Sequence, residues 1–442
     1  MFSKKLLQSL STVTLVNISI LFFGFLREIV FSSKLGISNF SDNFFYYYLV
    51  VEDFNAIIYT GLMFGLVSFY TKEKLSKQDI KNYIFRNARY LALFLIVLLL
   101  LQFILISFLQ NHSFNRLAFN SLLAIPFSIF NGLIMSFLVH NSKIALAIFS
   151  RAINYCGIIL FFLFIDIRND QNIIGLSILF GYLLQCLYLL IIIFFDKNKI
   201  SEPNKIRTLS LLKENYTWII APSLVPFCSN LIFRSIFIFE PDNLVSTINY
   251  ASKIIMILSA FTFSVILVGF QESNIKKRSN KIHLINDDLK NNVRLLSIVL
   301  IPLSIFISIF SNEIMSLIFL RGSFTEADVL KSSHILSLLI FSTFSAGLFG
   351  YLSRVYENII GRKKYHLFFL VWLILSSTLI ILFTGLDKSM IAYPVAQITS
   401  TSILSVLVFI SLKKEFKKIS YAEILLPITL NLILFIKTLI NF

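Results

Sequence analysis

The chain has 442 residues, of which 57% are hydrophobic and 14% are charged, and its mean hydropathy is +0.82. This composition excludes an ordinary soluble domain and indicates a membrane protein, so the lipid bilayer is an expected partner. The formal net charge of +16 does not indicate a nucleic-acid partner. The basic residues lie in short loops, where anionic lipid head groups and membrane insertion account for them.

About thirteen apolar stretches follow one another along the chain, each close to the length that a helix needs to cross a bilayer. In lipid only helices and closed barrels satisfy the backbone, and these runs are too long for barrel strands of ~10 residues. We therefore predict an all-α polytopic membrane protein. The stretches cover residues 12–31, 45–69, 88–109, 117–139, 144–165, 173–195, 216–239, 246–270, 295–319, 332–353, 366–385, 389–411 and 421–440.

The basic residues are concentrated in every second gap between these stretches. The N-terminus and the gaps after even-numbered stretches hold 29 of the 39 lysines and arginines, with Arg151 counted at the edge of the fourth gap. The gaps after odd-numbered stretches hold six. Because basic loops stay on the cytoplasmic side, we predict a cytoplasmic N-terminus and an external C-terminus.

No loop is long enough to form a soluble domain, and the polar connection 196–215 divides the stretches into two sets. We predict an N-terminal lobe with six spans over residues 1–200 and a C-terminal lobe with six spans over residues 201–415. One additional C-terminal span covers residues 416–442. Two six-helix halves of parallel topology predict a central cavity between them.

A faint internal repeat supports this division. Arg27, near the outer end of the first stretch, precedes the pair Asn43–Phe44, and Arg234 precedes the pair Asn249–Tyr250 by a similar distance. Chance similarity between apolar helices would explain the pattern equally well.

Prolines interrupt several of the stretches. Each proline removes a backbone donor and bends its helix, which would let a lobe rock, although prolines also occur in static bundles. The prolines concerned are Pro126, Pro222, Pro226, Pro302, Pro394 and Pro427.

Charged side chains inside the stretches are candidate binding residues, because a charge near the bilayer centre is costly and normally faces a cavity and a partner. All of them lie at mid-depth or in the outer half of the membrane, which predicts a cavity with polar walls in that region. They are Arg27 and Glu28 in the first stretch, Glu52 and Asp53 in the second, Arg234 in the seventh, Lys253 in the eighth and Glu313 in the ninth.

Other interpretations of these charges stay open. Arg27 and Arg234 could instead extend to the outer membrane surface. Glu52 and Asp53 point about 100° apart on a helix and cannot both face one cavity squarely, so we expect one of them to pair with Lys253 or Arg27. The whole set could also form a purely structural ion-pair network.

The residue pattern indicates no catalytic or cofactor site. Cys156, Cys186 and Cys228 all lie inside stretches and have no metal-binding spacing, and the histidines form no triad. The sequence has no GxxxxGK[ST] loop for a nucleotide. We therefore expect no enzyme activity, no metal and no cofactor, and a driving force from the membrane potential or a coupling ion.

Two regions of the chain carry a family resemblance. The segments Gly24–Glu28, Lys34–Ser38 and Ser41–Phe45 are similar to the first helix of the MurJ/MviN family of lipid II flippases and to the approach to its second helix. The segment Leu320–Asp328 is similar to the RGxFT segment of that family. The resemblance implies the multidrug/oligosaccharidyl-lipid/polysaccharide exporter fold, with two six-helix lobes around a central cavity in the bacterial inner membrane.

The segment that contains Thr325 and Asp328 also has a structural interpretation. A threonine followed three residues later by an acid is close to a capping box, which would begin a helix there. We favour this role over a contact with substrate.

The chain departs from the family pattern at three basic positions. Leu21, Asn55 and Lys253 stand where the family carries arginines, so the cavity is expected to be less basic. The family also has two helices after the core twelve, and this chain has one.

The resemblance implies a flippase for a polyprenyl-diphosphate-linked glycan, with the peptidoglycan precursor lipid II as the expected substrate. Arg27 and Lys253 would offer cationic partners to the diphosphate. Three alternatives remain: a flippase for O-antigen or exopolysaccharide units, a cation-coupled multidrug exporter, and a non-transporting scaffold. The candidate binding residues are Arg27, Lys253, Asp53, Glu52, Asn55 and Arg234.

Overall fold

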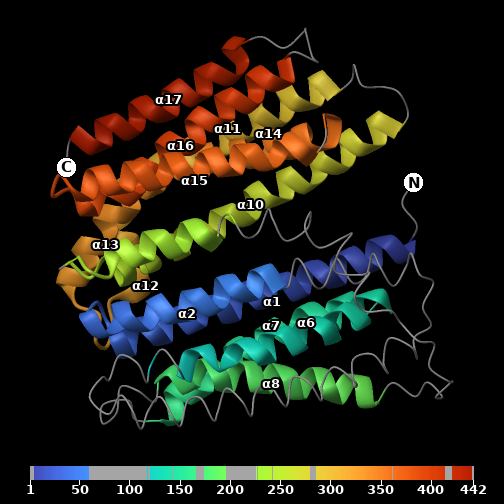
Figure 1. Ribbon diagram of the computed structural model, residues 1–442, viewed down its shortest axis with the longest axis vertical. Helices are drawn as coiled ribbons and strands as arrows, with labels where there is room; N and C mark the ends of the chain where they lie inside the picture. Colours follow the sequence, from blue (N-terminus) through green and yellow to red (C-terminus); the bar gives the residue numbers. More distant parts are fainter. Residues whose placement is uncertain are drawn as a thin grey trace. The chain divides into compact units, whose positions relative to one another are not determined.

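The computed structural model describes residues 4–58, 117, 120–141, 143–165, 174–195, 225, 227–240, 242–278, 285–360, 362–413 and 421–440. Throughout these ranges the regular elements are helices, and none of them contains a strand (Figure 1). The predicted all-α fold is therefore confirmed. It follows from the long apolar runs, because a helix satisfies its own backbone hydrogen bonds in lipid.

The chain divides into two compact units. Unit 1 covers Met1–Lys34 and Asn43–Phe227, and unit 2 covers Leu35–Asp42 and Cys228–Phe442. The predicted lobe boundaries at residues 200 and 415 stay a prediction, because both neighbourhoods fall in gaps between the described ranges.

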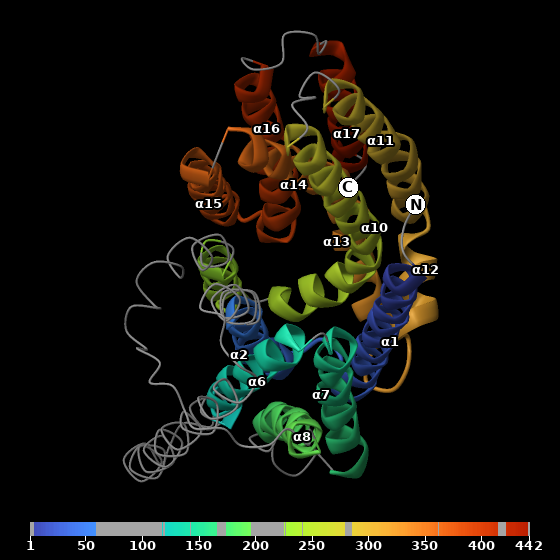
Figure 2. The ribbon, with the colours of Figure 1, turned by 90° about the vertical axis from the view of Figure 1, so that its right-hand side faces the viewer.

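The helices of unit 1 come from the first half of the chain. Helices α7 and α8 pack side by side (Figure 2). The helices are α1 (Lys4–Leu35), α2 (Asn39–Ile58), which begins in unit 2 and continues in unit 1, α6 (Ala124–His140), α7 (Ile144–Phe164) and α8 (Ile174–Phe194).

Glycines allow the close approach of α7 and α8. A Cβ atom on Gly157 would lie 2.9 Å from the Cα atom of Gly181. A Cβ atom on Gly181 would lie 2.8 Å from the carbonyl oxygen of Asn154. Small residues let helix backbones come close inside a membrane, where dispersion contacts replace the hydrophobic driving force.

The helices of unit 2 come from the second half of the chain. They are α10 (Leu244–Arg278), α11 (Ile285–Ile309), α12 (Ser311–Phe319), α13 (Glu326–Leu339), α14 (Ser342–Ile359), α15 (Arg362–Thr384), α16 (Ser389–Lys413) and α17 (Tyr421–Ile440). The apolar core of this unit is formed largely by α11, α14, α16 and α17.

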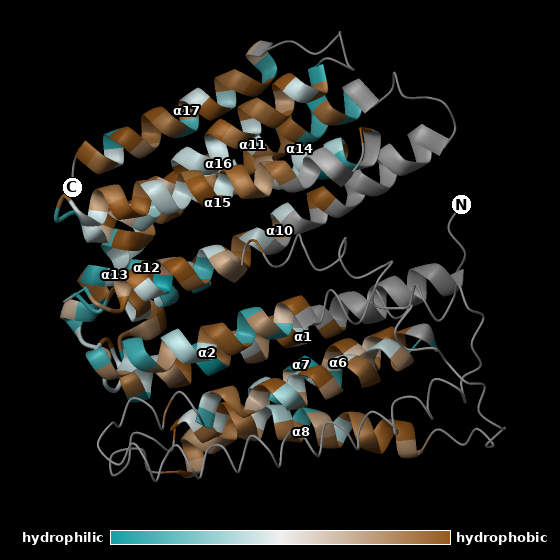
Figure 3. Ribbon diagram, viewed as in Figure 1, coloured by the Kyte–Doolittle hydropathy of each residue, from teal (hydrophilic) through white to brown (hydrophobic). Residues whose placement is uncertain are grey.

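Seven described helices are long and apolar enough to cross a bilayer, or eight if α13 and α14 count as one bent span. Helices α15 and α17 are hydrophobic along most of their length (Figure 3). The chain is therefore a multi-pass membrane protein. The predicted span 88–109 and parts of spans 45–69 and 216–239 lie outside the described residues.

Two predicted spans differ from the structure. The predicted span 295–319 is two helices, α11 and α12, and Glu313 is exposed in the first turn of α12 rather than buried. The predicted span 332–353 is also two helices, α13 and α14, which are bent by 41°. The capping box at the start of α13 is confirmed: the Thr325 side chain accepts from the Asp328 amide, and the Asp328 carboxylate accepts from the Thr325 amide.

The break between α13 and α14 is held by side chains of other helices. Ser304 of α11 donates its hydroxyl to the Ile340 carbonyl at 3.3 Å. Asn431 of α17, which is fully buried, donates to the Phe341 carbonyl at 3.1 Å. These contacts supply donors to carbonyls that a broken helix leaves without partners. The additional helix α17 is thus part of the packing of unit 2.

The connection between α1 and α2 belongs to unit 2, together with the first turn of α2, which contains Asp42. The Asp42 carboxylate accepts from the Ser246 amide at 2.7 Å and from the Val245 amide at 3.3 Å, so it caps the start of α10. The Ser246 hydroxyl donates to the same carboxylate. Asp42 precedes the predicted span 45–69, and burial raises its pKa to about 6, although these hydrogen bonds oppose the shift.

Candidate functional site

A buried arginine forms the centre of the candidate site in unit 1. Arg27 of α1 donates from Nε and Nη2 to Oε1 of Glu28, at 3.2 and 2.6 Å. It donates from Nη1 to Oε1 of Glu52 on α2, at 3.1 Å. The hydroxyl of Tyr48, one turn before Glu52, donates to the same Glu52 oxygen at 2.7 Å. One guanidinium is therefore shared by two carboxylates.

Aromatic rings surround the guanidinium of Arg27. Its Cζ atom lies 4.3 Å from the ring centre of Tyr155 on α7, 4.9 Å from that of Tyr48 and 5.6 Å from that of Phe31. A cation over an aromatic face is attracted by the negative face of the ring, and the planar guanidinium also stacks on it. Helices α1, α2 and α7 thus all contribute to holding this cation.

The Arg27 side chain does not extend to the surface of the protein. Only 4% of it is exposed, so the alternative interpretation as a surface-seeking arginine is wrong for this residue. The expectation that Glu52 or Asp53 pairs with Arg27 is confirmed for Glu52. Asp53, which points elsewhere on α2, is half-buried.

A second arginine lies close to this cluster. Arg151 is half-buried about two turns into α7, and its Nη2 atom lies 3.5 Å from the hydroxyl of Tyr155. The guanidinium of Arg27 lies over the ring of the same tyrosine, so Tyr155 contacts both arginines. Sequence reasoning assigned Arg151 to a cytoplasmic gap, because a cation so near a span edge contributes to the topology signal wherever its side chain points.

Neutral polar side chains of α2, α6, α7 and α8 form hydrogen bonds between these helices. The amide of Gln185 on α8 donates to the Ser150 hydroxyl at 3.1 Å and accepts from Asn154 at 3.4 Å. Asn55 of α2 accepts from the Ser128 hydroxyl of α6 at 2.6 Å. These bonds satisfy polar groups inside a membrane unit and link its helices. Asn55, at a position where the resemblance implies an arginine, therefore has a hydrogen-bond partner on a neighbouring helix.

The two remaining candidates belong to unit 2. Lys253 lies half-buried in α10, and Arg234 lies half-buried in the helix Phe227–Phe237. Both make contacts within the structure. A common site that combines them with Arg27 would join the two units and stays a prediction.

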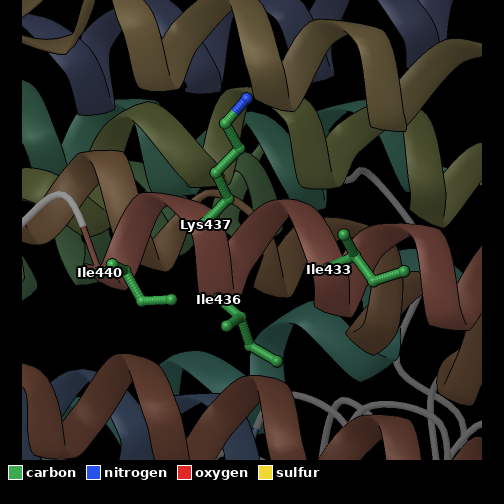
Figure 4. Close-up of a pocket in the computed structure, with 4 residues that line it drawn as sticks. All are labelled: Ile433, Ile436, Lys437 and Ile440. Atoms are coloured by element: carbon green, nitrogen blue, oxygen red, sulfur yellow. The ribbon is translucent and has the colours of Figure 1, made fainter.

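A hollow on the surface of α17 has a different character. It measures about 280 Å³ and is lined by Ile433, Ile436, Lys437 and Ile440. The lysine and Ile436 point to opposite sides of the helix (Figure 4). The walls of this hollow are almost entirely apolar, which suits hydrocarbon chains rather than a charged head group.

Comparison with known proteins identifies relatives of the chain. The family model described as "Lipid II flippase MurJ" matches residues 31–440. The protein "Probable lipid II flippase MurJ" of Buchnera aphidicola subsp. Acyrthosiphon pisum (strain APS) is 26% identical in an alignment of 394 residues that covers 81% of this chain and 73% of the relative. The protein of the same name from Buchnera aphidicola subsp. Schizaphis graminum (strain Sg) is 24% identical in an alignment of 368 residues that covers 77% of this chain and 70% of the relative.

Solved structures share the fold. "Lipid II flippase MurJ, inward closed conformation" matches with a TM-score of 0.73 at 21% identity, over 97% of this chain and 93% of the other. An inward-facing multidrug resistance MATE family transporter of the MOP superfamily matches with a TM-score of 0.66 at 14% identity, over 92% and 96%. The family model covers nearly the whole chain, and the chain therefore belongs to the MurJ family of lipid II flippases.

Proposed function

We propose that the chain moves lipid II, a polyprenyl-diphosphate-linked glycan, from the inner to the outer leaflet by alternating access. The observation that carries this proposal is the buried Arg27, placed inside a membrane unit of a chain that belongs to the MurJ family. Relatives of this family carry the name of lipid II flippases, which supports the choice of substrate.

The diphosphate explains why a flippase needs such a cation. Moving a multiply charged group through hydrocarbon without partners is prohibitive, so the head group requires a polar route. A guanidinium offers a planar pair of donors that matches two phosphate oxygens, whereas an ammonium acts as a point charge. In the proposed cycle Arg27 and Lys253 contact the diphosphate, with Glu52, Asp53, Asn55 and Arg234 nearby. The polyprenyl tail remains in the bilayer.

The charge pattern supports an orientation for this cycle. With the basic loops in the cytoplasm, the N-terminus lies inside, and the substrate enters from the inner leaflet of the bacterial plasma membrane. The two lobes of the proposed alternating-access cycle correspond to residues 1–200 and 201–415. The membrane potential or a coupling ion would drive the cycle.

The test is a rescue experiment in a bacterium whose own lipid II flippase can be depleted. The full chain should sustain growth and expose lipid II on the outer leaflet when it is the sole flippase. The Arg27→Ala variant, produced at equal level, should do neither. Growth without lipid II exposure, or failure of the wild-type chain to rescue, would contradict the proposal. Export of O-antigen units or of cationic drugs by the same cells would then favour the corresponding alternatives.

A further inference from the structure

The two carboxylates that share Arg27 differ in how they are held. Glu28 accepts two hydrogen bonds from the guanidinium, and its side chain is only 2% exposed. Glu52 accepts one hydrogen bond from the guanidinium, and its side chain is 24% exposed. A carboxylate that is buried and doubly bonded is costly to separate, whereas a partly exposed carboxylate can recover hydration when it leaves.

Glu52 also has a second partner that does not depend on the arginine. The hydroxyl of Tyr48 donates to Glu52 at 2.7 Å, and both residues lie on α2 one turn apart. If the Nη1 contact opens, the bond from Tyr48 remains for the Glu52 carboxylate. Glu28 lies next to Arg27 in the same helix and moves with it. Of the two carboxylates, Glu28 therefore stays with Arg27, whereas Glu52 can separate from it.

We infer that Glu52 is the exchangeable counter-ion of Arg27 and gives its place at Nη1 to a phosphate of the substrate, while Glu28 stays bound. This inference rests on the proposed function, because it assigns a role at the same site. It extends that function by identifying the group with which the diphosphate competes. Competition between Glu52 and the phosphate lowers the affinity of the site for the head group and so permits its release on the other side of the membrane.

The charge balance around the arginine supports the exchange. Arg27 and the nearby Arg151 together with Glu28 and Glu52 carry no net charge, so the closed cluster does not attract a diphosphate. When Glu52 leaves, Arg27, Arg151 and Glu28 carry a net charge of plus one, which attracts a diphosphate. The arriving phosphate thus meets a site that attracts it only after Glu52 has moved away.

Binding of farnesyl diphosphate to the purified full chain in detergent tests this inference. In Glu52→Gln the side chain keeps its shape and its acceptor oxygen for Tyr48 but loses its charge. We expect this variant to bind farnesyl diphosphate about tenfold tighter than the wild type, because the competing charge is gone. The matched control is Glu357→Gln, which neutralises an acid paired with Arg354 at 2.7 Å in α14 and should leave the affinity unchanged.

A second measurement separates exchange from a structural role. In the rescue strain, Glu52→Gln should expose lipid II more slowly than the wild type despite its tighter binding, since release becomes the slow step. Glu52→Asp keeps the charge on a shorter side chain and should give an intermediate affinity. Equal or weaker binding by a folded Glu52→Gln variant would overturn the inference while wild-type rescue leaves the proposed function standing. Absence of binding to the wild type together with failed rescue would overturn both.

Discussion

Replacing Arg27 by alanine should cost the protein both stability and transport, for reasons that can be separated. The substitution leaves Glu28, whose side chain is 2% exposed, as a buried carboxylate without its cation. Removing one partner of a buried ion pair typically costs about 3–5 kcal/mol, because the other charge stays buried and uncompensated. The contacts of the guanidinium with the rings of Tyr155 and Tyr48 are lost as well.

The matched comparison is Arg354→Ala. Arg354 bonds Glu357 at 2.7 Å, much as Arg27 bonds Glu28, but the side chain of Arg354 is 45% exposed and that of Glu357 is 13% exposed. Exposed ion pairs contribute about 0–1 kcal/mol, so this variant should unfold close to the wild-type temperature. Thermal unfolding of the purified proteins in one detergent measures both changes. A loss for Arg27→Ala no larger than that for Arg354→Ala would refute the reasoning from burial.

A double variant then distinguishes folding from function. Arg27→Ala with Glu28→Gln removes the stranded charge, so much of the lost stability should return. Lipid II exposure should not return, because the cation that we propose to bind the phosphate is still missing. Arg27→Lys should restore transport only in part, since an ammonium does not reproduce the forked contact. Full lipid II exposure by the double variant would show that Arg27 serves only the fold.

Four further predictions concern other parts of the chain. Burial raises the pKa of Asp42 from 3.8 to about 6, so between these pH values the folded state binds more protons than the unfolded state. The free energy of unfolding should therefore fall as the pH rises through this window. Asp42→Asn should flatten that slope in unfolding curves from pH 4 to 7. Gly181→Ala should destabilise unit 1 by ~1–3 kcal/mol, because the new Cβ atom would lie 2.8 Å from a backbone oxygen. In the control Gly350→Ala the new Cβ atom would meet only the flexible end of a side chain, at 3.0 Å, so this variant should unfold near the wild-type temperature. An introduced cysteine in the loop 70–87 should react with an impermeant thiol reagent only from the cytoplasmic side, and labelling of intact cells there would reverse the predicted topology. Lys253→Cys should react with a small aqueous thiol reagent, and a thiol that stays inert in all conditions would place this residue away from any cavity.

Local signals in the sequence were sufficient for several features of this protein. The apolar runs predicted the helices, since backbone polar groups in lipid leave few alternatives. Thr325 and Asp328 predicted the start of α13, because a capping box involves only residues three positions apart. The segments around Arg27 and Arg321 predicted the family that the comparisons confirm. Each of these inferences uses neighbours along the chain or the average chemistry of a stretch.

Other features depended on which helices meet in space. The break between α13 and α14 has no proline and is held by Ser304 and Asn431 from distant helices, whereas prolines led us to expect bends elsewhere. The distribution of basic residues placed Arg151 at the edge of a cytoplasmic gap but could not reveal its contact with Tyr155.

By itself the sequence determined that this is an all-α membrane protein of the MurJ family with charges inside its spans, because hydropathy, span length and motif spacing are properties of consecutive residues. Only the tertiary structure decided the partners of those charges. It placed Arg27 between Glu28 and Glu52, over the ring of Tyr155, with only 4% of its side chain exposed. The reason is physical: the depth of a charge follows from its position in a helix, but its neighbours depend on how that helix is rotated and packed against the others.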